Sequence, residues 1–194
     1  MASDLDAAVT EYRLRVVPVT AEQYAQFGEV LTVDPASRLP VGMYGDSVEV
    51  YRPGNFTAEA PIEFLLTRAK VRPFTVRWLE RHMELEQTFI PLSGDPFVQV
   101  VARPEAEEEN GLPALRELRA FLVPGDVAVK LHVGTWHEVP FPLVDGTLRL
   151  STSHARLTQG LQAELDARSE IGRLDVDKRS LETRLGVHVR VELP

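Results

Sequence analysis

The chain has 194 residues, 44% of them hydrophobic and 26% charged, a composition typical of one soluble globular domain. Its net charge of −8 argues against a nucleic-acid-binding surface, and its lack of cysteine excludes disulfides, thiolate nucleophiles and Cys-ligated zinc. No apolar run approaches the roughly 20 residues that cross a bilayer, and the first residues lack a secretory signal, so we expect a cytoplasmic protein without membrane contact.

The first elements are predicted to be a strand over 13–19 and a short helix over 20–28, which Thr20 can cap with Gln23 completing a capping box. Short segments rich in β-branched and aromatic residues follow, separated by Gly, Pro, Asp and Asn. They predict strands at 47–51, 62–71, 74–82, 87–92, 97–104, 119–124, 127–133 and 147–152. The acidic run 104–111 is expected to be a solvated loop. Strands at this spacing indicate a mainly β fold, either a sandwich or a barrel.

After Ser151 the hydrophobic residues change from a period of two to a helical period. Leucines at every fourth position predict a helix within 154–172, and a second short helix is expected over 175–186. Residues 187–193 alternate hydrophobic and polar side chains, which predicts a terminal strand that either supplies a sheet edge for pairing or covers one within the chain. No internal repeat or linker divides the sequence. We therefore expect one domain over 1–194 with a helical appendage at its C-terminal end.

Two stretches contain the residues best suited to chemistry. In "WLERHMELEQTFIPLSG", Glu80 and His82 are two apart, so they share one face of a strand. In "KLHVGTWHEVPF", His132 and His137 lie on either side of Gly134. Histidine suits both proton transfer, with an unperturbed pKa of about 6.5, and the binding of transition metals. The alternative for His82 is a structural hydrogen bond to a neighbouring carboxylate.

The strand 127–133 places its valines and leucine on one face. Lys130 and His132 therefore lie together on the other face, pointing either into a pocket or toward solvent. Trp136 is expected to pack in the core at the barrel rim, with a substrate contact as the alternative. Arg68 has the planar fork of donors that binds a substrate carboxylate, and its alternative is a surface charge. Arg149 is a weaker candidate of the same type.

The two stretches resemble the two cupin motifs in spacing. The slots of the first motif hold Glu80, His82, Gln87 and Gly94, and the ligand slot of the second motif holds His137. The resemblance implies a cupin-like β-barrel, or double-stranded β-helix, whose mouth binds a small ligand or a metal. It implies that a divalent transition metal, if one is bound, lies on His82, Gln87 and His137. A neutral Gln in the usual Glu slot weakens the attraction for such an ion.

The resemblance extends to a particular family. "VTAEQYAQFGEVL", "LERH", "QTFIPLSGDPFVQVVA", "LRAFLVPGD" and "HVGTWHEVPF" together resemble the ureidoglycolate lyase family over about 14–152. This implies a cupin-like barrel over 14–152, followed by a helical extension and terminal strand over 153–194. It also implies a homodimer and a lyase that cleaves a carbon–nitrogen bond, releasing glyoxylate and urea from ureidoglycolate in allantoin (purine) degradation.

The sequence departs from the family pattern at three places. Glu138 replaces the second of two consecutive histidines, Gly134 replaces an asparagine, and "STSHARL" replaces a "D-R-G-G" motif. These departures leave the substrate open, because specificity depends on the polar groups at the mouth of the barrel. One alternative is a cupin acting on a different small hydroxy or keto acid, and another is a non-catalytic small-acid-binding cupin.

The resemblance also suggests roles for individual residues. His137 or His132 is the expected base, and His82 with Glu80 is the expected acid or orienting pair. Arg68 is expected to hold the substrate carboxylate. Other residues expected to contact substrate are Lys130, Gln87, Glu138 and Trp136.

Overall fold

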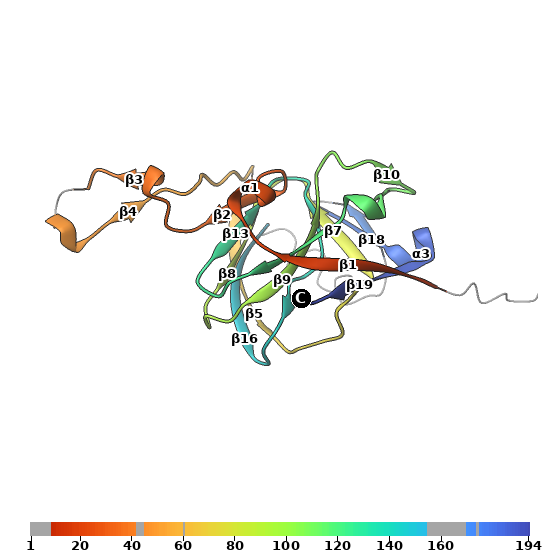
Figure 1. Cartoon of the computed structure of the whole chain (residues 1–194). Helices are drawn as coiled ribbons and strands as arrows, with labels where there is room; N and C mark the ends of the chain where they lie inside the picture. Colours follow the sequence, from red (N-terminus) through yellow and green to blue (C-terminus); the bar gives the residue numbers. More distant parts are fainter. Residues whose placement is uncertain (1–8, 42–44, 60, 155–169, 174) are drawn as a thin grey trace, which may run out of the picture.

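The computed structural model describes residues 9–41, 45–59, 61–154, 170–173 and 175–194, and their chain is mainly β-strand (Figure 1). Most strands belong to two sheets. The larger sheet contains, in spatial order, β17 (Ile171–Arg173), β18 (Val176–Ser180), β7 (Trp78–His82), β14 (Trp136–His137), β9 (Phe97–Ala102), β12 (Arg119–Val123), β1 (Thr10–Pro18), β19 (Val187–Glu192) and β6 (Thr75–Val76), with β15 (Phe141–Pro142) also paired to β9. The smaller sheet contains β2 (Gly28–Leu31), β13 (Ala128–Leu131), β8 (Gln87–Pro91), β16 (Thr147–His154) and β5 (Ile62–Ala69).

The remaining elements are short. They are β3 (Arg38–Leu39), β4 (Val50–Tyr51), β10 (Glu108–Glu109), β11 (Leu112–Pro113), α1 (Ala21–Tyr24), α3 (Leu181–Leu185) and three 3₁₀ turns at Pro35–Ser37, Gly45–Ser47 and Leu115–Glu117. Figure 1 shows the hairpin of β3 and β4 extending away from the body. Among the described residues, no helix is long and apolar enough to cross a membrane.

The space between the two sheets is filled by a hydrophobic cluster to which both contribute. Its buried members are Tyr24, Phe27, Phe89, Phe97, Val101, Phe121, Val123, Val129 and Leu131. In β9, Phe97 and Val101 belong to this cluster, whereas Val98, Val100 and Ala102 belong to a second cluster on the opposite face. Both faces of β9 are therefore covered, which explains why the strand is hydrophobic throughout. The predicted mainly β, barrel-like fold is confirmed.

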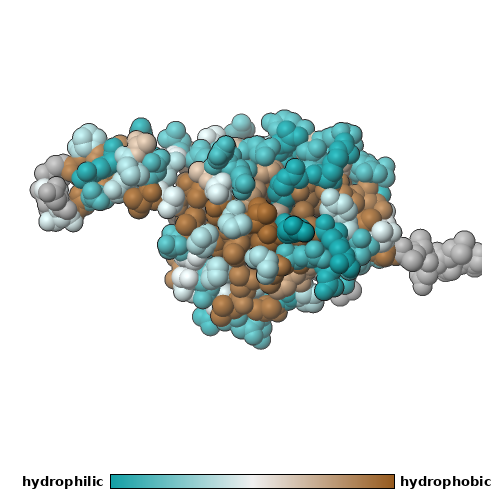
Figure 2. Space-filling view, viewed as in Figure 1, coloured by the Kyte–Doolittle hydropathy of each residue, from teal (hydrophilic) through white to brown (hydrophobic). Residues whose placement is uncertain are grey.

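Most of the predicted elements are present with changed boundaries. The Thr20 side chain accepts a hydrogen bond from the backbone N–H of Gln23 at 3.2 Å and so caps α1, as predicted, although this helix ends at Tyr24 rather than at Gly28. The strand predicted over 74–82 is divided into β6 and β7. The acidic run contributes β10, whose glutamates are exposed, and Figure 2 shows hydrophilic surface over this part of the molecule.

The C-terminal part differs most from its prediction. The helix expected over 175–186 is wrong for its first half, because Val176–Ser180 forms β18, and only Leu181–Leu185 is helical. The helix expected within 154–172 falls mostly outside the described residues, while its two ends belong to β16 and β17. The predicted terminal strand is confirmed as β19. It pairs with β1 in parallel and with β6 in antiparallel fashion, so it covers a sheet edge within the chain.

Candidate functional site

A tight turn after β13 fixes the position of β14. The N–H of Thr135 bonds to the carbonyl of His132 at 3.1 Å, and the Thr135 hydroxyl donates to the carbonyl of Phe27 at 2.8 Å. Gly134 has a φ of +81°, a region that favours glycine, and its N–H bonds to the carbonyl of His82 at 2.7 Å. The turn is therefore tied directly to β7, and the strand that follows it lies beside β7.

Glu80, His82 and His137 form a compact group that we call the inner cluster. His137 lies opposite Glu80 in the pairing of β14 with β7, and His82 is on the same face of β7 as Glu80. One potential ligand atom of each residue lies within 4.8 Å of those of the other two. The two imidazole rings are stacked with centroids 5.5 Å apart, and both are buried. The structure thus brings together three of the four predicted catalytic residues.

The hydrogen bonds of the two imidazoles determine which nitrogens face the centre of this cluster. Nδ1 of His137 is 3.0 Å from the carbonyl oxygen of Thr135, and Nδ1 of His82 is 2.7 Å from Oδ2 of Asp175. Because both partners are acceptors, each Nδ1 carries a hydrogen, and in the neutral ring Nε2 presents a lone pair. Neither Nε2 atom has a hydrogen-bond partner among the described residues, although Nε2 of His137 lies 3.5 Å from Oε1 of Glu80.

The inner cluster therefore brings acceptor atoms together. Two imidazole lone pairs and a carboxylate would repel one another unless a proton or a metal cation lay between them. Burial alone would raise the pKa of Glu80. However, the neighbouring His137 imidazole, together with His82 and Lys178, lowers this pKa to about 2, so Glu80 stays ionised.

Asp175 is itself held firmly beside the cluster. It is 1% exposed, and its Oδ1 accepts the N–H groups of Met83 and Glu84 at 2.8 and 2.6 Å. Burial would raise the pKa of Asp175, but the hydrogen bond and charge of His82, together with these two N–H groups, lower it. An ionised, fully bonded carboxylate is a strong acceptor for the Nδ1–H of His82.

A cavity of about 340 Å³ opens beside the inner cluster. Its lining residues are Trp78, Leu79, Glu80, His137, Glu138, Val139 and Lys178. Glu138, predicted to contact substrate, pairs with Arg72 at 3.2 Å. Burial, opposed by Arg72 and reinforced by the charge of Glu80, raises the pKa of Glu138 to about 7. The cavity thus combines an anionic carboxylate, an imidazole and an ammonium group around a space large enough for a small organic acid.

Further polar atoms without hydrogen-bond partners among the described residues belong to strands around the barrel interior. They are Oε1 of Gln87, Oε1 of Gln99 and Nη1 of Arg149. Gln87 pairs in register with Leu131 of the interior cluster, and the Arg149 guanidinium lies 5.5 Å from the ring centroid of Phe97. Burial and the nearby charge of Arg72 lower the pKa of Arg149 to about 10. Buried polar atoms are costly when unsatisfied, and these three lie beside the hydrophobic cluster rather than in the lining of the cavity.

Lys130 and His132 meet a different carboxylate, on the other side of the smaller sheet. Val129 and Leu131 face the barrel interior, so Lys130 points away from it. Its Nζ lies 3.1 Å from both Glu86 and Glu29, while Nδ1 of His132 lies 3.7 Å from Glu86. We call Lys130, His132, Glu86 and Glu29 the outer cluster. The predicted association of Lys130 with His132 is present, but their shared partner is Glu86 rather than a residue of the inner cluster.

Two other predicted substrate contacts also lie away from the inner cluster. Arg68 is exposed on the outer face of β5, because its neighbour Thr67 pairs with the inward-facing Arg149. Trp136 is fully buried in the hydrophobic cluster of the larger sheet, with the Arg81 guanidinium 4.2 Å from its ring centroid. It therefore packs in the core, on the face of β14 opposite to His137.

Several residues around the cavity are not among those predicted from the sequence. Lys178 belongs to β18 and Asp175 directly precedes this strand, in a stretch that the sequence predicts to be helical, and Arg72 lies in the connection before β6. Lys178 faces Glu80 directly in the pairing of β18 with β7. The stretch "DVDKRS" contains a single hydrophobic residue, Val176, so its sequence carries no periodic signal that could have indicated a strand.

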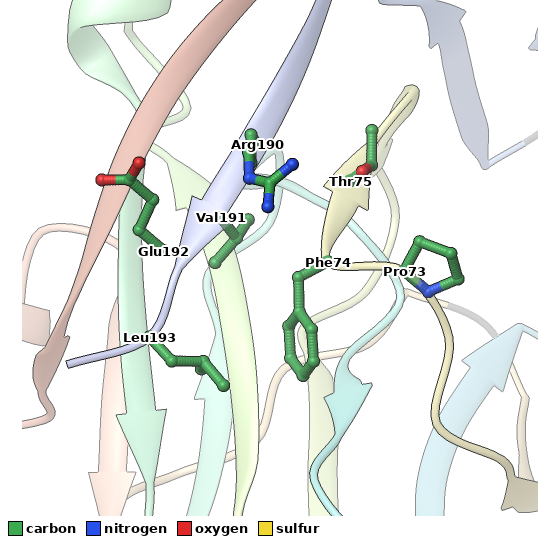
Figure 3. Close-up of a pocket in the computed structure, with 7 residues that line it drawn as sticks. All are labelled: Pro73, Phe74, Thr75, Arg190, Val191, Glu192 and Leu193. Atoms are coloured by element: carbon green, nitrogen blue, oxygen red, sulfur yellow. The ribbon is translucent and has the colours of Figure 1, made fainter.

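A larger hollow of about 580 Å³ lies elsewhere on the surface, between β6 and β19. Figure 3 shows the side chains of Phe74 and Leu193 at the same end of this hollow. The backbone hydrogen bond from Val191 to Phe74, 2.8 Å long, joins its two sides. Its polar side chains are Thr75, Arg190 and Glu192, which offer no imidazole or convergent carboxylates. The cavity beside the inner cluster is therefore the better candidate for a reaction site.

Comparison with known proteins identifies related sequences. The sequence profile of the ureidoglycolate lyase family matches residues 11–151. The chain is 34% identical over 129 residues to the ureidoglycolate lyase of Pseudomonas putida, covering 64% of this chain and 74% of that protein. It is 31% identical over 138 residues to the ureidoglycolate lyase of Azotobacter vinelandii, covering 68% and 79%. A structure of RmlC from Streptococcus suis in complex with dTDP-D-xylose aligns with 10% identity over 57% of this chain and 56% of that chain, and its TM-score of 0.29 is too low to inform fold or function.

Proposed function

The chain belongs to the ureidoglycolate lyase family, and on this premise we propose that it is a lyase that cleaves ureidoglycolate to glyoxylate and urea. The observation that carries the proposal is the inner cluster. Its Glu80, His82 and His137 all lie within the matched residues and converge beside a cavity of suitable size.

The reaction needs a base and an acid. The hydroxyl of the carbinol carbon loses a proton, its oxygen forms a carbonyl, the carbon–nitrogen bond breaks, and the urea nitrogen gains a proton. We propose that Nε2 of His137 accepts the hydroxyl proton, because the Thr135 carbonyl holds the hydrogen on its Nδ1. Glu80, ionised and 3.5 Å away, stabilises the imidazolium that forms. His132 is not proposed as the base, because it belongs to the outer cluster.

Protonation of the leaving nitrogen completes the reaction. The imidazolium of His137 can return its proton to the urea nitrogen, so that one residue serves as base and then as acid. His82 presents its own Nε2 to the same centre and supports the substrate oxygen or the proton in transit. The buried surroundings of both imidazoles exclude bulk water and strengthen these interactions.

The donor set also fits a divalent transition metal. Glu80, His82 and His137 would hold it, and the bond from His82 to Asp175 is the carboxylate support that metal-binding histidines commonly have. Such an ion would act as a Lewis acid on a substrate oxygen. The sequence predicts Gln87 as a metal ligand together with the two histidines. In the proposed set Glu80 is that ligand instead, and the amide of Gln87 is buried at the start of β8.

A coupled assay for glyoxylate and for urea tests the proposal. We expect the purified protein to release both products from ureidoglycolate in equal amounts. A panel of small hydroxy and keto acids, followed by mass spectrometry, covers the possibility of a different substrate. Calorimetric binding of these acids without turnover would instead support the non-catalytic alternative and contradict the proposed lyase activity. Elemental analysis of the same preparation measures any bound metal.

We retain the cytoplasmic location and the homodimer as proposals. The outer face of β5, the last strand of the smaller sheet, supports the dimer because Phe64 and Leu66 are 68% and 66% exposed there. We expect the protein to sediment as a dimer and a Phe64→Ser/Leu66→Ser variant to sediment as a monomer. A monomeric wild-type protein at micromolar concentration would contradict this proposal.

A further inference from the structure

We propose that β18, which lies beyond the residues matched by the family profile, completes the active site, with Lys178 binding the substrate carboxylate and Asp175 positioning His82. The inference rests on the proposed function, since it assigns the anion-binding group of that site. The matched residues end at 151, whereas Asp175 precedes β18 directly and Lys178 lies within it.

Lys178 has the placement that a carboxylate-binding residue needs. It pairs in register with Glu80, and it lines the same cavity as His137 and Glu138. Its Nζ lies 4.7 Å from the ring centroid of Trp78, a contact that holds the ammonium over an aromatic face. Among the described residues, no carboxylate lies within ion-pair distance of this ammonium, so its charge is available to an anion.

The other cations near the cavity are less available. Arg72 already pairs with Glu138 at 3.2 Å and also donates to the carbonyl of Val139 at 2.6 Å. Arg149 donates to the carbonyl of Pro140 at 3.0 Å and does not line the cavity. Arg68, the residue predicted from sequence, faces outward on β5. Lys178 is therefore the cation whose position best fits an anionic substrate held beside His137.

Asp175 acts on a different part of the site. Its Oδ2 accepts the Nδ1–H of His82 at 2.7 Å, which leaves the lone pair of Nε2 directed at Glu80 and His137. Two backbone N–H groups hold its other oxygen, so the carboxylate cannot turn away. Asp175 does not line the cavity, so it is a positioning residue that fixes the tautomer and the orientation of His82.

Kinetics of charge variants test the role of Lys178. We expect Lys178→Gln to raise KM for ureidoglycolate by about 10- to 100-fold with a smaller change in kcat, because the lost contact is a charge-assisted one. Lys178→Arg should recover part of the loss. Lys70→Gln removes the same charge from an exposed position and serves as the control. An unchanged KM in Lys178→Gln would overturn the assignment while leaving the lyase activity established.

Failure of the proposed lyase activity and failure of the Lys178 assignment give different results. If the wild-type protein does not turn over ureidoglycolate, the proposed function fails, and calorimetric titration with glycolate still tests Lys178. Weaker glycolate binding by Lys178→Gln than by Lys70→Gln would then support an anion site, and equal binding by the two variants would overturn it.

Nitrogen-15 NMR of the imidazoles tests the role of Asp175. In the wild-type protein, we expect His82 to carry its hydrogen on Nδ1, and the Nε2–H tautomer would overturn the assignment without any variant. Asp175→Asn should lose this single tautomer and lower both kcat and the affinity for added Zn²⁺ by about 10- to 100-fold. Asp177→Asn, altered two residues further along the chain at a carboxylate paired with Arg81, is the control expected to keep the tautomer. Equal tautomer and kcat in Asp175→Asn would contradict the positioning role.

Discussion

The inner and outer clusters are both built from buried and half-buried titratable side chains, yet they differ in how their polar atoms are satisfied. In the outer cluster, Lys130 contacts Glu86, Glu29 and the carbonyl of Asn55, and Glu86 also accepts the N–H of Thr57 at 2.6 Å. In the inner cluster, the Nε2 atoms of both histidines lack hydrogen-bond partners among the described residues. Charges that satisfy one another and the backbone hold a fold together, whereas converging atoms left unsatisfied are prepared for a ligand.

This difference explains the roles of two segments. The outer cluster fastens residues 55–57 to β13 and to Glu86, the residue before β8. Residues 55–57 belong to the connection that leads from the projecting β3–β4 hairpin back to the body (Figure 1). The inner cluster is tied to its surroundings through Asp175 and the carbonyl of Thr135, but its converging Nε2 atoms border a cavity. Substitutions in the two clusters should therefore separate loss of activity from loss of stability.

Removal of the proposed base should have the largest effect. We expect His137→Ala to lower kcat by about a thousandfold or more, in the range typical of a lost general base. The free energy of unfolding should change little by comparison, because this imidazole makes one hydrogen bond to a backbone carbonyl. Steady-state kinetics and urea unfolding followed by circular dichroism measure the two quantities. Near-normal turnover in this variant would contradict the proposed mechanism.

The outer cluster should respond in the opposite way. Lys130→Met leaves two carboxylates facing each other without their cation, and we expect it to lower the free energy of unfolding by about 3–5 kcal/mol. The kcat of the molecules that remain folded should stay close to that of the wild type. The matched double variant Lys130→Met/Glu86→Leu should be less destabilised than the single one, because it removes the uncompensated charge as well. A large loss of kcat in folded Lys130→Met would restore Lys130 to the substrate site.

A substitution at Glu80 tests whether the anion of the inner cluster contributes to catalysis rather than to stability. Glu80→Gln keeps the size of the side chain but removes the anion beside His137, and we expect kcat to fall by about 10- to 100-fold. Stability should be unchanged or slightly higher, since the variant buries one charge fewer. Kinetics and thermal unfolding of the same preparation test this pair of effects, and a destabilised but fully active variant would contradict it.

The parts of this fold that could be predicted from sequence are those with a local cause. The alternation of Val187, Val189 and Val191 predicts a strand with one buried face, and all three are buried in β19. Glu80 and His82 could be placed on one face for the same reason, whereas their meeting with His137 was reached through the resemblance to a family.

Other features depend on which surfaces meet in three dimensions. Alternation could place Lys130 opposite Val129, yet only the packed sheets decide which of these faces the interior. The stretch that contains Asp175 and Lys178 has a single hydrophobic residue, Val176, before its serine, so neither period is strong enough to distinguish a strand from a helix. Its pairing with β7, rather than its own propensity, determines its structure.

A more exposed ion pair next to β17 gives the smallest expected effect. Glu170 accepts both Nε and Nη2 of Arg184 at 2.7 Å, together with the N–H of Ser180 at 3.0 Å. The hydrogen bond from Arg184, supported by Ser180 and opposed by slight burial, lowers the pKa of Glu170 from 4.5 to about 2. A lowered carboxyl pKa stabilises the fold above the unfolded-state value, and this contribution is lost as the pH falls from about 4.5 to about 2. We expect Glu170→Gln to cost about 1 kcal/mol at pH 7, since solvent screens the pair, and to match the wild type near pH 2 in urea unfolding. A difference that persists at the lowest pH would show that packing, rather than charge, accounts for the role of Glu170.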